Sequence, residues 1–186
     1  RLSWQLSSEE RGRRQTAYRV LVASSPAWLA ADVGDKWDSG EVRSDRSVNV
    51  PYAGSPLASA EICWWKVRAW DNRSQPGPWS APATFEMGLL HASDWRGIWI
   101  TAGKVSSPLF RKEIFLDKPV KRARLYVCGL GYNEVYVNGV KADDRVMDPA
   151  PTWYDNLLPL DLRCRCLYAS YDISRLLKTG PNAIGV

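Results

Sequence analysis

Four cysteines are the side chains in this sequence with the widest range of chemistry, from metal binding to disulfide formation. They are Cys63, Cys128, Cys164 and Cys166. A structural zinc site takes Cys and His ligands that are commonly paired as CxxC, but no such pair occurs here and His91 is the only histidine. Cys164 and Cys166 are separated by one residue, too close for an easy mutual bridge. We therefore expect reduced, structural thiols and no zinc.

Acidic residues are the second group that could do chemistry, and several lie together in the second half of the chain. Glu134, Asp143, Asp144 and Asp148 surround an Asn138-Gly139 pair, so carboxylate, amide and backbone oxygens are concentrated there. All of them lie in strand or hairpin contexts, with no helical scaffold to bring two carboxylates together for acid–base work. The stretch is oxygen-rich, but it predicts no catalytic pair.

Composition and charge narrow the class of protein. Of the 186 residues, 45% are hydrophobic and 24% charged, which is typical of a soluble globular chain, and no run approaches the roughly 20 apolar residues of a membrane span. The net charge of +5 comes mainly from the part after Gly97. Its basic cluster has no interleaved aromatic residues, so we interpret it as a solvent-exposed segment that leads into a strand, and we expect no nucleic-acid binding. The cluster comprises Lys118, Lys121, Arg122 and Arg124.

The ten tryptophans are unusual, and aromatic residues favour strands. Tryptophan is found both in the cores of β-sandwiches and on surfaces that stack against sugars, and both interpretations stay open. In the first half, period-two alternation and turn residues predict strands at 2–6, 18–23, 36–42, 47–50, 62–70 and 83–87. In strand 62–70 we expect Trp65, Val67 and Ala69 on one face and Trp64, Lys66, Arg68 and Trp70 on the other. A weaker pattern allows a helical turn at 28–31.

The second half has strand character at 98–100, 109–116, 124–128, 133–137 and from 183 onward. Asn138-Gly139 between apolar runs is the strongest local signal, since both residues tolerate positive φ, and it predicts a tight hairpin. Residues 172–178 could form one capped helical turn that Gly180-Pro181 ends. We expect domains at 1–87 and 98–186, joined by a linker at 88–97.

Several sequence blocks resemble, in order, the leading module of bacterial α-L-rhamnosidases of glycoside hydrolase family 78. They are RLSW (1–4), QTAYRVLV (15–22), WDSG (37–40), WKVRAWD (65–71) and FEMGLL (85–90). The second half is similar to the next module of that family through DW (94–95), WI (99–100), LFRK (109–112), ARLYV (123–127), GLGY (129–132), YVNG (136–139), DP (148–149) and NAIGV (182–186). The resemblance implies an all-β chain, with an immunoglobulin or fibronectin type III-like sandwich followed by a jelly-roll.

Two features depart from the resemblance. The tyrosine corner of such sandwiches often has Tyr six residues after a Leu, but Cys63 occupies that place after Leu57. An extra stretch at 156–164 also separates two of the family's blocks. From position 98 onward we count about five or six strands against the seven or eight of a sandwich, so we expect the jelly-roll to be truncated and an unpaired edge to favour dimerisation.

The resemblance implies an accessory role without catalysis. Enzymes of this family hydrolyse the glycosidic bond with inversion of configuration, using two carboxylates roughly 6.5 to 9.5 Å apart. In the family these carboxylates come from a downstream α-helical barrel that this chain lacks. We expect the chain to be inactive alone and to act as a scaffold for the remainder of the parent enzyme. The alternative is a generic fibronectin-like adhesion or interaction module, which has no reason to carry the blocks at 37–40 and 131–139 together. Cytoplasmic and secreted bacterial locations both stay open.

The resemblance also implies candidate binding residues in the second module, because some jelly-rolls of the family bind rhamnose with the help of calcium. A rhamnose-containing carbohydrate would contact Tyr132, Glu134, Asn138, Trp153 and Tyr154, and calcium, with its roughly six to eight oxygen ligands, would bind Asp143, Asp144 and Asp148. No other cofactor is expected. The structural alternative is that Asn138 serves the turn, the aspartates are a solvated hairpin end and the tyrosines cover a core edge.

Overall fold

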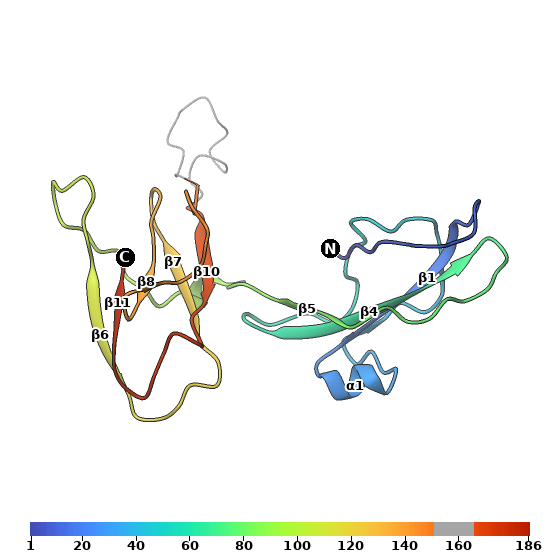
Figure 1. Ribbon diagram of the computed structural model, residues 1–186, viewed down its shortest axis with the longest axis horizontal. Coiled ribbons are helices and arrows are strands. Elements are labelled where there is room, and N and C mark those ends of the chain that lie inside the picture. The colour runs from blue at the N-terminus through green and yellow to red at the C-terminus, as the bar shows by residue number, and fades with distance from the viewer. Residues whose placement is uncertain (151–165) are drawn as a thin grey trace. The chain divides into compact units, whose positions relative to one another are not determined.

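The chain folds as two antiparallel β units, Arg1–Gly97 and Ile98–Val186 (Figure 1). The computed structural model describes residues 1–150 and 166–186. Trp153, Tyr154, Cys164 and the expected insertion at 156–164 lie outside these residues. In the described part of the chain every paired strand is antiparallel, and no helix is long and apolar enough to cross a membrane. The predicted all-β class is confirmed.

One sheet forms the first unit. Its strands are β1 (Gln15–Ala23), β2 (Trp37–Asp38), β3 (Val42–Arg43), β4 (Ile62–Asp71) and β5 (Ala83–Glu86). The order is β2-β1-β4-β5, with β3 also pairing with β1. The two long central strands are rich in β-branched and aromatic residues, which suit a pleated surface buried on both sides.

Strand β4 divides its side chains between two cores, as predicted. Cys63, Trp65 and Val67 contact the larger core, whose other buried members are Leu2, Tyr18, Val20, Val22 and Val50. Trp64 contacts the smaller core on the opposite face, with Leu21, Ala23 and Leu29. The alternation follows from the period of two along a strand.

Helix α1 (Pro26–Ala30) covers the second face of this sheet (Figure 1). The Ser25 hydroxyl accepts a hydrogen bond from the Trp28 N–H, and Pro26 occupies the first turn, where its missing N–H costs nothing. Lys66 of β4 is buried beneath the helix, where its ammonium donates to the Leu29 carbonyl at 2.6 Å and pairs with Asp32. A buried charge is tolerated because both partners compensate its desolvation.

Other elements of the first unit differ from the sequence prediction. The strand expected at 2–6 is reduced to a single bridge between Leu2 and Val50, and the strand expected at 47–50 shares that bridge. The strand expected at 36–42 splits into β2 and β3, because Gly40 adopts a φ of 60° between them. Cys63 is fully buried where a tyrosine corner was considered, and the Tyr52 hydroxyl instead donates to the Ser55 carbonyl at 2.7 Å.

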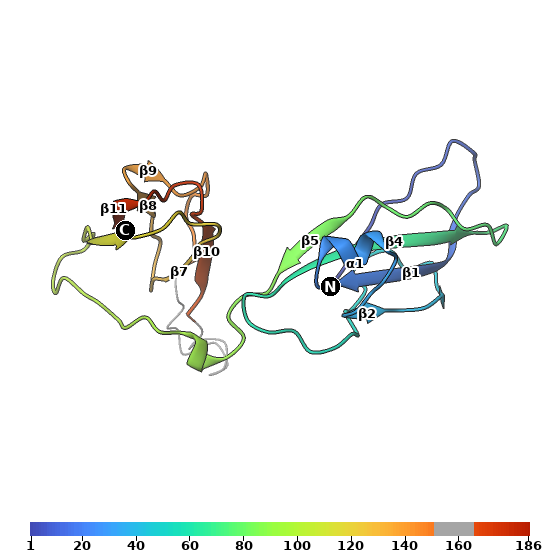
Figure 2. The same cartoon turned by 90° about the horizontal axis from the view of Figure 1, so that it is seen from below.

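The described residues of the second unit form two small sheets (Figure 2). The larger has the order β6-β11-β8-β9, with bounds Arg111–Leu116, Gly180–Gly185, Tyr136–Val137 and Val140–Lys141. The smaller pairs β7 (Arg124–Cys128) with β10 (Tyr168–Asp172). The buried core contains Val135, Val137, Ala169, Tyr171 and Ile173.

The β8–β9 hairpin confirms the strongest local prediction. Asn138 and Gly139 adopt φ angles of 53° and 84°, the positive values that a two-residue hairpin turn of this kind requires. Tyr136 and Val137 pair with Lys141 and Val140.

Two predictions for the second unit are wrong. Residues 98–100 form no strand, and Ile98 is 87% exposed. Residues 172–178 form a turn and not a helix, because the Asp172 carboxylate accepts hydrogen bonds from the Ser174 N–H and hydroxyl and stabilises a local turn. Gly180 and Pro181 then begin β11. Pro181 is tolerated there because β8 pairs only with Ile184 and Gly185 at the other end of β11.

Candidate functional site

Asn138, a predicted sugar contact, has its side-chain amide engaged inside the protein. Its nitrogen donates to the Leu176 carbonyl at 2.8 Å and to the Asn182 side chain at 2.9 Å, and its oxygen accepts from the Ala183 N–H at 2.9 Å. These bonds join the hairpin to β11 and to the turn before it. A sugar could engage this amide only by replacing them, so the observed role of Asn138 is structural.

Glu134 and its neighbours form an exposed polar cluster. The Glu134 carboxylate accepts hydrogen bonds from the Lys141 ammonium at 2.6 Å and the Tyr136 hydroxyl at 2.9 Å. These two hydrogen bonds lower the pKa of Glu134, and the same carboxylate raises the pKa values of Lys141 and Tyr136. Glu134 is therefore held as an ionised acceptor, which can bind a hydroxyl group but is unsuited to donate a proton.

Tyr132 is the remaining predicted contact in the described part of the chain. Its side chain is 58% exposed, so its ring is not covering a core edge. The ring is available for stacking against an apolar sugar face. The other two predicted rings, Trp153 and Tyr154, lie outside the described residues.

Asp143 and Asp148, two of the three predicted calcium ligands, are bridged by Arg145. The guanidinium Nε donates to Asp143, and Nη1 lies 2.9 Å from an Asp148 oxygen. Within the described residues, no group of three or more His, Cys, Asp or Glu is placed to hold a metal ion. As arranged, these residues do not fit calcium, because a cationic side chain occupies the position between the two carboxylates that the ion would need.

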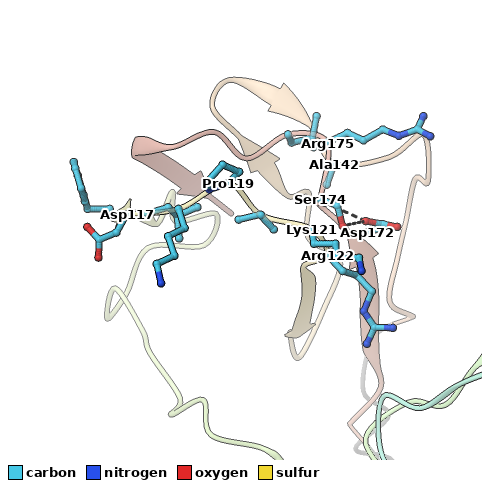
Figure 3. A pocket seen from close by; sticks show the side chains of 13 residues that line it. Asp117, Pro119, Lys121, Arg122, Ala142, Asp172, Ser174 and Arg175 are labelled. Atoms are coloured by element: carbon cyan, nitrogen blue, oxygen red, sulfur yellow. Dashed lines mark hydrogen bonds between the residues drawn. The ribbon is translucent and has the colours of Figure 1, made fainter.

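A hollow of about 1380 Å³ lies elsewhere in the second unit (Figure 3). It is formed by the end of β6, the loop that leads to β7 and the turn after β10. We call it the basic hollow, after the cations among its lining residues Phe115, Lys118, Lys121, Arg122, Ser174 and Arg175. In Figure 3, Asp117 lies at one end, while Lys121 and Arg122 lie near the hydrogen-bonded pair Asp172 and Ser174.

In the described lining of the basic hollow, some charged side chains have ionic partners and others have none. Hydrogen bonds from Ser174, and then the Arg124 guanidinium, hold the pKa of Asp172 well below its usual range. Its carboxylate therefore already has partners. Lys118, Lys121 and Arg175 make no ion pair or hydrogen bond with any described residue. The sequence showed the cluster at 118–124 but not that Arg175, far along the chain, lines the same hollow.

A smaller hollow of about 540 Å³ in the first unit lies between the segment near Trp4 and the loop after β4. Its polar groups satisfy one another: the Trp4 indole donates to Gln15 at 2.9 Å, and Arg13 pairs with Asp71. The Gln15 amide in turn donates to the carbonyls of Ser44 and Arg46, both at 3.0 Å. These side chains are therefore held by partners within the first unit.

Among the described carboxyl groups, those with a shifted pKa are not suited to act as a general acid. A glycosidase acid needs a raised pKa. Every described carboxyl group with a shifted pKa has it lowered, and these are Glu10, Asp32, Asp35, Asp38, Glu61, Asp71, Asp94, Glu134 and Asp172. By fold the chain is a pair of antiparallel β domains.

Two successive segments of the chain match two domain families. Residues 1–91 match the Rha78A-like N-terminal immunoglobulin domain, and residues 118–186 match the α-L-rhamnosidase N-terminal domain. The chain therefore belongs to the N-terminal region of the α-L-rhamnosidases, with an immunoglobulin-like domain followed by a second β domain.

Individual relatives agree with this assignment. An α-L-rhamnosidase from Formosa agariphila is 38% identical, across 99% of this chain and 21% of the relative. The solved α-L-rhamnosidase of Dictyoglumus thermophilum has a TM-score of 0.86 at 38% identity, covering 98% of this chain and 22% of that one. That of Aspergillus terreus has a TM-score of 0.75 at 31% identity, covering 98% and 20%. The chain thus spans about a fifth of the length of the relatives it matches.

Proposed function

We propose that this chain is the non-catalytic N-terminal accessory region of an α-L-rhamnosidase, which hydrolyses terminal α-L-rhamnosides by inversion. The observation that carries the proposal is the ordered match of both units to the N-terminal domains of that family. An inverting glycosidase also needs one protonated and one ionised carboxyl group across the scissile bond. Every described carboxyl group whose pKa is shifted has it lowered, which supports an accessory role for this region.

The proposal is tested by incubating the purified chain with an aryl α-L-rhamnoside. We expect release of the aryl group at the uncatalysed rate, because the described residues offer no acid and base pair. The proposal fails if the chain accelerates release and a single Asp→Asn or Glu→Gln substitution within it abolishes that acceleration.

We further propose that the second unit helps to recognise rhamnose-containing carbohydrate. Tyr132 would supply an exposed ring, and Glu134 an ionised acceptor for a sugar hydroxyl. Binding of L-rhamnose by the chain, measured by calorimetry, should weaken in Tyr132→Ala and persist in Tyr168→Ala, whose ring packs edge-on against Tyr126. Equal loss in both variants, or no binding by the unaltered chain, would contradict this part of the proposal.

A further inference from the structure

We propose that the basic hollow binds an acidic carbohydrate, a saccharide that carries carboxylate or sulfate groups. This site is separate from Tyr132 and Glu134, and it goes beyond the accessory role proposed above. It is a binding site only and needs no chemical step.

The described lining of the basic hollow contains more cations than carboxylates. Lys118, Lys121 and Arg175 have no ionic partner among the described residues, while Asp172 is already paired with Arg124 from outside the lining. Asp117 is the one other carboxylate among the described lining residues. Cations left unpaired around one concave surface raise the local potential and attract an anionic ligand.

Part of the lining of the basic hollow is apolar. The Phe115 ring is 69% exposed at the end of β6, and Pro119 and Leu176 also line the hollow. A pyranose presents an apolar C–H face and polar edges, so a ring beside cations matches a sugar that bears acidic groups better than it matches a bare anion. Sequence-independent binding of single-stranded nucleic acid uses several successive rings, whereas among the described residues Phe115 is the single aromatic residue of the lining.

The basic hollow is large enough for an oligosaccharide. Clefts for small ligands commonly measure about 300 to 1,000 Å³, and this hollow is larger at about 1380 Å³. A single phosphate or sulfate ion would leave most of it empty. An oligosaccharide of several units would contact both the cations and Phe115.

Calorimetry with the whole chain tests the inference. The probes are oligogalacturonate and its methyl ester, which share a backbone and differ in charge, together with dextran sulfate, dextran and a single-stranded DNA oligonucleotide. The test variant is Lys118→Glu with Lys121→Glu. The matched control is Lys104→Glu with Lys112→Glu, which changes the net charge equally at exposed positions outside the hollow. Phe115→Ala tests the ring, and circular dichroism verifies folding.

We expect oligogalacturonate to bind at least about tenfold tighter than its methyl ester, because each exposed ion pair contributes little alone but several act together on one ligand. The test variant should lose about tenfold in affinity and the control less than about threefold. Phe115→Ala should weaken binding of oligogalacturonate as well. Dextran sulfate binding in place of oligogalacturonate, with the same dependence on Lys118 and Lys121, would assign the acidic group as sulfate and also support the site.

The inference is overturned if neither acidic saccharide binds, if the ester binds as well as the acid, or if the control variant loses as much affinity as the test variant. Tighter binding of the DNA oligonucleotide, lost on substitution of Lys118 and Lys121, would also overturn it. Because no turnover is measured, these outcomes are independent of whether the parent protein cleaves rhamnosides.

A separate observation concerns two thiols, and we infer that Cys128 and Cys166 form a disulfide in the presence of a small-molecule disulfide oxidant. Cys128 is the last residue of β7 and pairs with Tyr168 of β10. Cys166 lies two residues before Tyr168 in the sequence, next to the end of this strand pair. The Cys128 thiol donates to the Leu167 carbonyl at 3.3 Å, and Cys166 is the residue before Leu167. The two cysteines are therefore close to each other at the end of the β7–β10 pair.

Thiol–disulfide exchange with oxidised glutathione supplies a balanced route. Burial, and then the neighbouring Cys166, raises the pKa of Cys128, so the exposed Cys166 is the better first nucleophile. Its thiolate attacks the glutathione disulfide, forming a mixed disulfide and releasing one reduced glutathione. Cys128 loses its proton and displaces the second glutathione. Two protein thiols are oxidised to one disulfide, and one oxidised glutathione is reduced to two thiols.

Peptide mapping by mass spectrometry tests this second inference. The whole chain is treated with oxidised glutathione, alkylated and digested without reduction, with buried Cys63 as an internal control that should stay reduced. We expect the cross-linked peptide pair containing Cys128 and Cys166. A stable glutathione adduct on Cys166 without the cross-link, or a bond from either cysteine to Cys164, would overturn the inference.

Discussion

At the scale of the residue, Arg145 fixes the segment in which a calcium site was expected. Besides Asp143 and Asp148, its guanidinium donates to the Ser170 carbonyl at 2.9 Å and lies 4.3 Å from the centre of the Tyr171 ring. The side chain therefore ties the loop after β9 to β10.

Replacing this guanidinium should destabilise the second unit. For Arg145→Ala we expect a loss of about 1 to 2 kcal/mol in the free energy of unfolding, since charge-assisted bonds are lost but the site is partly exposed to water. Denaturant unfolding measures this loss, with Arg111→Ala, whose pair with Glu113 is highly exposed, as a near-neutral control. Millimolar calcium should leave the unaltered chain unchanged, and a calcium-dependent rise in stability would contradict this account.

Asp172 should make the second unit sensitive to acid. Because its pKa is depressed in the folded state, its contribution to stability is complete above the ordinary carboxyl pKa of about 4 and is lost as the pH falls toward the lower folded pKa. Asp172→Asn should lower stability at neutral pH and flatten its decline between about pH 4 and pH 2. Thermal unfolding across this range is the measurement. Asp144→Asn, at an exposed position, should keep the decline, and an identical pH profile for Asp172→Asn would contradict the assignment.

At the scale of the element, the β8–β9 hairpin depends on Asn138 for both its backbone and its side chain. The left-handed conformation costs a residue other than Gly or Asn about 1 to 2 kcal/mol. Asn49 has a similar φ of 55°. Asn49→Ala should therefore cost about 1 kcal/mol and Asn138→Ala about 2 to 4, because the latter also breaks three hydrogen bonds. Equal losses in denaturant unfolding would show that the amide network contributes nothing.

Elements whose sequence contained a complete local signal were predicted well. Strand 124–128 matches β7 at both ends, and the turn at Asn138-Gly139 needed only its own two residues. The segment at 98–100 has equally apolar residues but pairs with no strand, because a strand requires a partner that periodicity does not reveal. The turn at 172–178 was misjudged because Asp172 and Ser174 stabilise a local turn as readily as a helix start.

The candidate site was less predictable than the fold. Asn138 and Arg145 are engaged by Asn182 and Ser170, which lie far away in sequence and reach them only through the pairing of β11 and β10. Sequence spacing alone indicated an oxygen-rich stretch but not the guanidinium between two of its carboxylates. For the same reason Arg175 could not be assigned to the basic hollow before the fold was known.

At the scale of the whole molecule, the chain contains two units with separate cores. The expected connector at 88–97 is attached to the first unit, since the Ser59 hydroxyl accepts a hydrogen bond from the Leu90 N–H at 2.8 Å and donates to Asp94. Both units are matched in order in relatives about five times longer. The central claim is that this pair supports a rhamnosidase without performing its chemistry.

A chimera tests that claim most directly. This chain would replace the matching 22% of the Dictyoglumus thermophilum α-L-rhamnosidase, and the release of an aryl group from an aryl α-L-rhamnoside would be measured for the chimera and for the chain alone at equal concentration. We expect the turnover of the chimera to stay within about tenfold of that of the unaltered relative, which corresponds to a change of no more than about 1.4 kcal/mol in the activation barrier. We expect no turnover by the chain alone. Turnover by the chain alone that a single carboxylate substitution abolishes would contradict the central claim.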